Sequence, residues 1–307
     1  MLPLTVRVPA SSANLGPGYD AFGVALGLHA RFSAEVADEW SVRVVGEGAA
    51  ELPAGLDNPV VLAMRRVFGE CGDDRLRARV FCHSRIPVGR GFGSSAAAIV
   101  AGCVLADALC SVPLGRDTLF GIAVGIEGHA DNVAAALYGG FTVAWRDEAG
   151  ARCTRIDPPG LAAVLLPAGG TRSTPEARAA LPPTVSHGDA AFTAGRAGLM
   201  AAGLALGRPD LVRYGAEDRL HEPYRSGGPR TAPDARRALL EAGADAAVLS
   251  GSGPSLVALV VDASDGIAMH RAERVAKRVR RALRSIPDWE EPLAVAVDRE
   301  GAVLEDR

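Results

Sequence analysis

The segment PVGRGFGSSAAA at residues 87–98 has the clearest potential for chemistry in this sequence. Its glycines stand at alternate positions, 89, 91 and 93, which lets the backbone turn tightly and brings bare N–H groups close to a ligand. The alanine-rich stretch that follows predicts a buried helix at about residues 94–109, and the unpaired N–H groups at its start would face the same space. A di- or triphosphate fits this arrangement. Ser94 and Ser95 could cap the helix, donate to phosphate oxygens or bind Mg²⁺.

An isolated Gly-x-Gly-x-Gly pattern is equally compatible with a plain turn before a capped core helix. The segment does not match either of two common phosphate-binding sequences. It lacks the GxxxxGK[ST] of a Walker A loop, and it lies in mid-chain rather than after the first strand, where a GxGxxG dinucleotide loop would stand. The loop therefore needs support from other segments before a function can be assigned to it.

Three segments together resemble the GHMP kinases, a superfamily that includes galactokinase, homoserine kinase, mevalonate kinase and phosphomevalonate kinase. They are PASSANLGPGYD at 9–20, the glycine-rich segment, and LSGSGPS at 249–255, and they occur in the family's order. The resemblance covers the whole chain and implies a two-domain α+β fold. An N-terminal ATP-binding domain similar to ribosomal protein S5 domain 2 would span residues 1–150, and a ferredoxin-like C-terminal domain would span 151–307.

Further segments resemble the homoserine kinases within that superfamily. They are EGHADNVA at 127–134 with LYGG at 137–140, TPEARAALP at 174–182, and DRLHEPYR at 218–225. This resemblance implies ATP-dependent phosphorylation of the side-chain hydroxyl of L-homoserine to O-phospho-L-homoserine, a step in threonine biosynthesis. It also implies direct in-line transfer, ATP and Mg²⁺ as cofactors, an amino acid as substrate and a homodimer as the assembly.

The resemblance assigns the nucleotide to the glycine-rich segment and the metal to two oxygen ligands. The nucleotide-binding residues would be Pro87, Gly89, Arg90, Gly91, Phe92, Gly93, Ser94, Ser95, Ala96 and Ala97. Ser95 and Glu127 would hold Mg²⁺, since hard oxygen ligands suit this ion. Glu127 directly precedes Gly128 and His129, where some homoserine kinases carry an insertion, so the direction of its side chain is left open.

The same resemblance assigns the amino-acid substrate to scattered polar residues. Asp20 suits the substrate ammonium, and Asn14 can hold the hydroxyl. Arg178 and Arg225 suit the carboxylate, because a guanidinium can bind it through two parallel hydrogen bonds. The other substrate-binding residues would be His129, Asn132, Thr174, Gly251 and Ser252. The implied catalytic residues are Asn14, Asp20, Ser95 and Glu127. No general base is evident, and Asp20 is the nearest candidate if one is used.

Hydrophobic patterning predicts both strands and helices around these segments. The first ~45 residues are predicted to form strands, with clear alternation at 5–8 and 41–45, and further strands are predicted at about 79–82, 141–145, 161–166, 246–249, 256–261 and 293–297. Helical spacing and caps predict helices at about 58–70, 94–109, 117–128, 131–139, 187–206, 234–242 and 264–284. Neighbouring strands joined as hairpins favour an α+β fold over a doubly wound sheet. The basic residues at 264–284 lie opposite an apolar stripe, which indicates a solvated helix face.

Composition excludes several classes of protein. A net charge of -3 over 307 residues gives no general attraction to nucleic acid. The sequence has no secretory signal and no apolar run that approaches the ~18 residues of a transmembrane helix. Its five cysteines are scattered without CxxC spacing, which predicts reduced, buried thiols. We therefore expect a cytoplasmic protein with no membrane or nucleic-acid partner.

Three alternatives stay open on the sequence. Another GHMP kinase, acting on L-threonine, a sugar or mevalonate, is the nearest, although paired arginines favour an amino acid. A methyl-sized difference between acceptors is worth only ~1–3 kcal/mol, so the sequence does not resolve it. A catalytically silent ligand-binding protein of the same fold is opposed by the presence of Asp20, Ser95 and Glu127. A nucleic-acid binder of the S5 type is opposed by the net charge.

Overall fold

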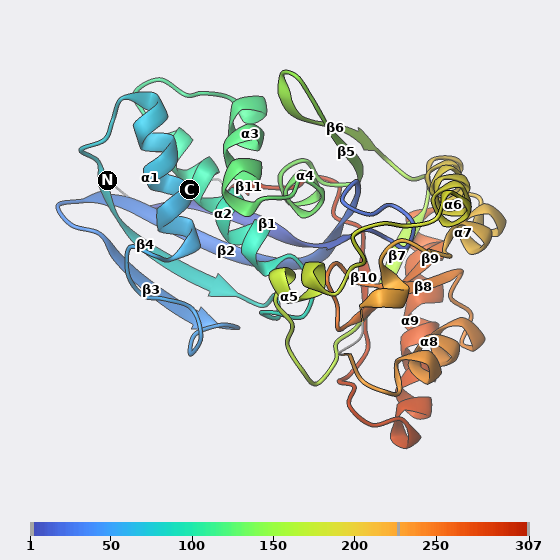
Figure 1. Cartoon of the computed structure of the whole chain (residues 1–307). Helices are drawn as coiled ribbons and strands as arrows, with labels where there is room; N and C mark the ends of the chain where they lie inside the picture. The colour runs from blue at the N-terminus through green and yellow to red at the C-terminus, as the bar shows by residue number, and fades with distance from the viewer. Residues whose placement is uncertain (1–2, 226–227, 306–307) are drawn as a thin grey trace.

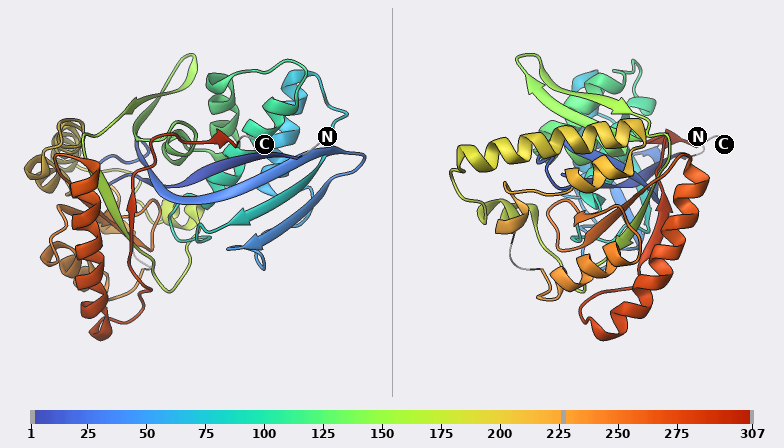
Figure 2. Two further views of the ribbon diagram at one scale, coloured as in Figure 1. Left: turned by 180° about the vertical axis from the view of Figure 1, so that it is seen from behind. Right: turned by 90° about the vertical axis from the view of Figure 1, so that its right-hand side faces the viewer.

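The computed structural model describes residues 3–225 and 228–305, which form two sheets with helices packed against them (Figure 1). The first sheet and the helices α1–α4 belong mainly to the N-terminal half. The second sheet and the helices α8 and α9 belong to the C-terminal half (Figure 2). The predicted α+β class is confirmed, because antiparallel strand pairs dominate both sheets.

The first sheet has seven strands, of which five follow the order β11-β1-β2-β4-β3. They are β1 (Leu4–Ala13), β2 (Phe22–Ala37), β3 (Ser41–Gly46), β4 (Arg77–Ser84) and β11 (Val303–Leu304). β5 (Phe141–Asp147) pairs with the start of β2 and with β6 (Gly150–Ile156). The register between β1 and β2 shifts between Pro9 and Ala10, where proline has no N–H for the ladder. This irregular end of β1 leads into the predicted substrate segment.

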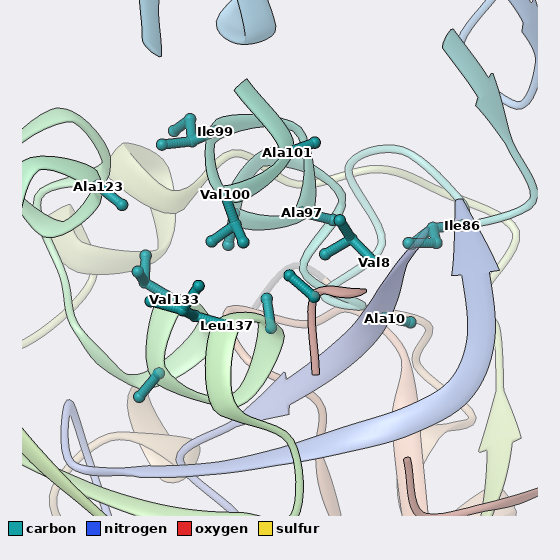
Figure 3. Packing of buried hydrophobic residues seen from close by; sticks show 14 of the residues in the cluster. Val8, Ala10, Ile86, Ala97, Ile99, Val100, Ala101, Ala123, Val133 and Leu137 are labelled. Atoms are coloured by element: carbon teal, nitrogen blue, oxygen red, sulfur yellow. The ribbon is translucent and has the colours of Figure 1, made fainter. Parts of the chain in front are cut away.

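Four helices cover one face of the first sheet: α1 (Pro59–Cys71), α2 (Ser94–Leu109), α3 (Arg116–Glu127) and α4 (Asp131–Tyr138). α2 lies at the centre of the core, and its residues from Ala96 to Cys103 are buried without interruption. Figure 3 shows Ala97 and Val100 of α2 close to Val8 of β1 and to Val133 of α4. The prediction of a helix buried on nearly all sides is confirmed, and the packing fixes where the start of α2 points.

The second sheet has four antiparallel strands in the order β10-β7-β9-β8. They are β7 (Leu161–Leu166), β8 (Ala246–Leu249), β9 (Leu256–Val261) and β10 (Leu293–Ala296). β7 and β9 are buried on both faces, since one face packs on the first core and the other on α8 (Ala232–Glu241) and α9 (Asp265–Ala282). α9 buries Ala268, Ala272, Val275 and Val279, and most of its arginines form the solvated face that the sequence predicts; Arg271 instead pairs with Asp245 and Asp262.

The other helices are α5 (Thr174–Ala179), α6 (His187–Leu206) and α7 (Pro209–Gly215), with 3-10 turns at Glu222–Tyr224 and Leu283–Ser285. The patterning did not predict α5, α7, β6 or β11, which are short or largely exposed. The predicted domain boundary between residues 150 and 151 stays a prediction: β6 begins at Gly150 in the first sheet, and β11 returns to that sheet from the C-terminal end. No helix within 3–225 and 228–305 is both long and apolar enough to cross a membrane.

Candidate active site

A cavity of about 220 Å³ brings the predicted segments together. Its walls come from the end of β1, the glycine-rich segment, the start of α2, the junction of α3 and α4, α5, and the turn between β8 and β9. The predicted site residues that line it are Asn14, Asp20, Pro87, Gly89, Gly91, Phe92, Gly93, Ser94, Ser95, Glu127, His129, Asn132, Thr174, Arg178, Arg225, Gly251 and Ser252.

Three predicted nucleotide-binding residues do not line the cavity. The Arg90 side chain forms an ion pair with Glu290 instead. Ala96 and Ala97 belong to the first turn of α2, where their side chains are buried. The Ala97 N–H already donates to the Gly93 carbonyl at 2.9 Å. The two alanines lie next to the site because the sequence motif continues into α2, where small side chains allow close packing.

The glycine-rich loop is fixed by contacts that exclude side chains. Gly91 has φ +83°, and a Cβ there would lie 2.1 Å from the Ser250 carbonyl oxygen. Gly93 has φ +70°, and a Cβ there would lie 2.1 Å from Ser11 Oγ. Gly93 is the N-cap of α2 in a left-handed conformation, so neither Ser94 nor Ser95 caps the helix. Both serines instead stand in the first turn and line the cavity.

The turn between β8 and β9 supports this loop from the C-terminal half. Ser250 Oγ donates to the Gly91 carbonyl at 2.7 Å and lies 2.9 Å from Ser12 Oγ. The Gly251 N–H donates to the Ala13 carbonyl at 3.2 Å. The LSGSGPS segment thus joins the two halves at the cavity.

A group of three acidic or basic side chains lies where α3 meets α4. Glu127 Oε2 accepts from Ser95 Oγ at 2.7 Å, and its Oε1 lies 3.5 Å from His129 Nε2. His129 Nδ1 lies 2.9 Å from Asp131 Oδ1. Burial raises the pKa of Glu127, an effect only partly offset by Ser95 and His129. Burial also lowers the pKa of His129, but the hydrogen bond and charge of Asp131 together with the charge of Glu127 outweigh it, and the net shift is upward.

The Ser95–Glu127 contact fits part of a magnesium site whose remaining oxygen atoms would come from a bound molecule. Both groups offer hard oxygen atoms, and Glu127 points at Ser95 rather than at solvent, which answers the question the sequence left open. Within the described residues, no three His, Cys, Asp or Glu side chains converge as a metal site of their own. A divalent cation here would therefore need further oxygens, such as those of nucleotide phosphates.

The amino-acid side of the cavity is built on a strained turn after β1. Asn14 and Asp20 both have positive φ, +69° and +57°, which is uncommon for residues other than glycine. The turn is held because Asn14 Oδ1 accepts from the Asp20 N–H at 3.0 Å and Asn14 Nδ2 donates to the Gly251 carbonyl at 2.9 Å. Asn14 therefore has a structural task as well as a place in the cavity wall.

Two arginines face this turn. Arg178 donates to Asp20 through two hydrogen bonds, Nη1 to Oδ2 at 2.9 Å and Nη2 to Oδ1 at 2.7 Å. The buried Arg225 donates from Nη1 to the Gly251 carbonyl at 2.5 Å, while its Nε has no hydrogen-bond partner among the described residues. The Tyr19 ring lies close to both guanidinium groups, at 5.8 Å from Arg178 and 5.5 Å from Arg225. Burial lowers the pKa of Arg225.

α5 positions Arg178 through a local sequence signal that the patterning overlooked. Ser173 Oγ accepts from the Glu176 N–H at 3.3 Å, and Glu176 Oε2 accepts from the Ser173 N–H at 3.0 Å. This reciprocal capping box, with Pro175 in the first turn, specifies a helix start in the sequence STPE. Recognising it would have placed Thr174 and Arg178 on the first two turns of one short helix.

The cavity also has lining residues that the sequence did not single out as site residues. They are Ala13, Leu52, Pro59, Val88, Ala98, Asp131 and Arg172. The apolar ones come from separate segments, and no motif or spacing connects them. Arg172 carries a sequence signal, since it precedes Thr174 by two residues in the glycine-containing stretch GGTRST.

Family models match both halves of the chain. The model described as the GHMP kinases N-terminal domain matches residues 58–140, and the one described as the GHMP kinases C-terminal domain matches residues 196–286. These ranges contain the glycine-rich loop with the α3–α4 junction and the turn between β8 and β9, respectively.

Curated relatives extend the similarity over the whole chain. A homoserine kinase of Streptomyces coelicolor is 42% identical over 269 residues, covering 85% of this chain and 86% of its own. A homoserine kinase of Clavibacter michiganensis is 39% identical over 305 residues, covering 98% of this chain and 93% of its own.

Solved structures show the same arrangement of elements. A homoserine kinase from Cytophaga hutchinsonii superimposes with a TM-score of 0.86 at 27% identity, covering 99% of this chain and 97% of its own. A mevalonate kinase from L. major gives 0.68 at 14% identity, with 95% of both chains covered, which is a likeness of fold alone.

Proposed function

This chain belongs to the homoserine kinases of the GHMP kinase family, and from that premise we propose that it transfers the γ-phosphoryl group of ATP to the side-chain hydroxyl of L-homoserine. The product is O-phospho-L-homoserine, an intermediate of threonine biosynthesis. The observation that carries the proposal is that one cavity contains both a phosphate loop and a clamp for an amino acid.

The phosphate side of the cavity suits a nucleotide. The loop from Gly89 to Gly93 leaves room for phosphate next to its backbone, and the first turn of α2 adds unpaired N–H groups and the positive end of a helix dipole. Leu52, Pro59 and Val88 give this side an apolar wall. Such a wall suits the flat, uncharged part of a nucleotide.

The other side suits the charged groups of an amino acid. The Asp20 carboxylate can accept from an ammonium group, and Arg178 and Arg225 can donate to a carboxylate. Among residues 3–225 and 228–305 the Nε of the buried Arg225 has no partner, which supports this role, because a buried donor without a partner costs free energy until a ligand satisfies it. A sugar or mevalonate would offer no ammonium group to Asp20, so the geometry favours an amino acid.

We propose that Ser95 and Glu127 hold the Mg²⁺ of the nucleotide, which would neutralise phosphate charge. The chain's own residues would then act by positioning. The α2 terminus orients the phosphates, His129 is held by Asp131 beside Glu127, and Asp20 keeps the acceptor in line. No side chain is required as a base, because phosphoryl transfer through a loose transition state depends mainly on positioning and charge. Homodimer assembly and a cytoplasmic location are proposed from membership of the family.

ADP release by purified protein with ATP and Mg²⁺ tests the proposal, with L-homoserine, L-threonine, L-serine, mevalonate and galactose in parallel. We expect stimulation by L-homoserine and a higher KM for it in Arg225→Ala. Arg219→Ala is the matched control, since that guanidinium is half-exposed over Phe192 and does not line the cavity. Stronger stimulation of ADP release by another acceptor would contradict L-homoserine as the substrate. ATP binding without turnover on any acceptor would favour a ligand-binding role.

A further inference from the structure

Arginine must supply the positive side chains of this cavity, because lysine is almost missing from the protein. The only lysine in the sequence is Lys277, which lies on α9 in the C-terminal half and does not line the cavity. The arginines that line it are Arg172, Arg178 and Arg225. Phosphoryl transfer develops negative charge that such groups stabilise.

Two of these three arginines are already engaged. Arg178 donates both terminal nitrogens to Asp20, and Arg225 is buried against the Gly251 carbonyl. Arg172 differs from them: in the described part of the chain, its guanidinium forms no ion pair within 4.0 Å and no side-chain hydrogen bond. It is half-buried and lines the cavity, so it is a cation held there whose donors have no partner among the described residues.

The backbone on both sides of Arg172 is fixed by hydrogen bonds. The Arg172 N–H donates to the Gly89 carbonyl at 2.8 Å, which docks this segment on the phosphate loop. The next residue, Ser173, is the N-cap of α5 and is locked by the capping box. Arg172 therefore projects from a well-defined backbone rather than from a loose loop. Such preorganisation is what makes a donor effective toward a transition state.

The position of Arg172 lies between the two sides of the cavity. Its backbone is bound to the nucleotide side at Gly89, and it immediately precedes the segment that carries Thr174 and Arg178 on the substrate side. Its charge is also near enough to contribute to the lowered pKa of Arg225. The group that passes from one side of the cavity to the other during the reaction is the γ-phosphoryl group.

We propose that Arg172 is a catalytic residue that donates to the γ-phosphoryl group during transfer, an inference that rests on the proposed kinase function. In that step the bond between the γ-phosphorus and the bridging oxygen breaks, and ADP keeps its electron pair. A new bond forms from the acceptor hydroxyl oxygen to the phosphorus, and the hydroxyl proton passes to solvent. Arg172 neutralises charge on the equatorial oxygens while both bonds are partial.

The test compares Arg172→Met and Arg172→Lys with the wild-type protein in single-turnover rapid-quench experiments. Arg85→Met serves as the matched control, because Arg85 is exposed, precedes the same loop and does not line the cavity. We expect Arg172→Met to slow the transfer step by about 10²-fold or more, and Arg172→Lys to recover part of that loss. Arg85→Met should keep the wild-type rate.

Binding measurements separate this role from others. Calorimetric titration with ADP alone should give nearly equal Kd values for the wild type and Arg172→Met. Titration with ADP, Mg²⁺ and aluminium fluoride, which imitates the phosphoryl group in transit, should be weakened at least tenfold in the variant.

Three results would overturn the proposal: an Arg172→Met transfer rate within threefold of the wild type, a loss of ADP affinity as large as the loss of rate, or a change confined to the KM of the acceptor. Because every comparison is made against wild-type turnover, a wild type that phosphorylates none of the acceptors contradicts the proposed function instead. The melting temperature of each variant shows whether the fold is preserved.

Discussion

Asp20 and Arg178, which the sequence assigned separately to the substrate's ammonium and carboxylate, form a bidentate ion pair with each other across the cavity. The pair is about two-fifths exposed on each side, so water and ligand can reach it. An amino acid carries both of the charges that this pair contains. Its ammonium can join Asp20 and its carboxylate can join Arg178 without leaving either side chain unpaired. The pair is thereby organised to bind a zwitterion.

Replacing Arg178 by lysine tests this organisation. A lysine keeps the charge but loses the planar fork that bonds to both Asp20 oxygens. We expect the KM for L-homoserine to rise about tenfold, which corresponds to ~1.4 kcal/mol, with a smaller change in the KM for ATP. Steady-state kinetics with each substrate varied in turn would measure this. An equal rise in both KM values would contradict a role confined to the amino acid.

Replacing Glu127 by glutamine tests the proposed metal site. The amide is nearly isosteric and can still accept from Ser95 Oγ, so the hydrogen bond of 2.7 Å can persist while the charge is lost. We expect kcat to fall by about 10²-fold and the Mg²⁺ concentration for half-maximal rate to rise. A Mg²⁺ titration of ADP release measures both. If the Mg²⁺ concentration for half-maximal rate did not change, Glu127 would not be a ligand of the metal.

Most of the structure could be predicted wherever the sequence has strong periodicity. The helix predicted at 94–109 and the strand predicted at 161–166 have the bounds found for α2 and β7, because long buried elements carry an unmistakable apolar pattern. β6 and β11 were missed because β6 is largely exposed and β11 has only two residues, so their pairing partners rather than their own patterns specify them.

The site followed from motifs rather than from periodicity. Sequence motifs predicted which residues would meet, but they did not predict that Asp20 would pair with Arg178 or that Asn14 would brace the Gly251 carbonyl. Those contacts join residues separated by more than 150 positions, and they depend on how the two sheets pack. Arg172 escaped attention because a single arginine in a loop is usually a surface residue.

The raised pKa of His129 predicts a pH-dependent contribution to stability. Asp131 and Glu127 together stabilise the protonated ring more than burial and Arg178 oppose it, so the folded state binds the proton more tightly than the unfolded state. The contribution is therefore complete below the unfolded pKa of about 6.5 and is lost as the pH rises through the folded pKa. We expect the free energy of unfolding to decline less between pH 6 and pH 9 in His129→Gln than in the wild type. Urea denaturation at both pH values measures it, and equal declines would refute the coupling.

The close approach of Gly91 to Ser250 predicts that this glycine joins the two halves of the active site. Gly91→Ala and Gly72→Ala form a matched pair, because both glycines have a positive φ, +83° and +75°, but only Gly91 of the two has neighbours within 4 Å of the added Cβ. Each alanine should cost about 1–2 kcal/mol for its left-handed backbone. Gly91→Ala should cost about 1–3 kcal/mol more, since its Cβ must displace the Ser250 carbonyl.

The two glycine variants should differ in their KM values as well as in their stability. Displacing Ser250 would move the neighbouring Gly251 carbonyl, which accepts from both Asn14 and Arg225. A change in the phosphate loop would then reach the amino-acid clamp. We expect Gly91→Ala to raise the KM values for ATP and L-homoserine together, whereas Gly72→Ala, which lies away from the cavity, should leave both near the wild-type values. Urea denaturation and steady-state kinetics on the two variants measure these effects. If Gly91→Ala changed only the KM for ATP, the loop and the clamp would be independent, and the contact through Ser250 would serve the fold alone.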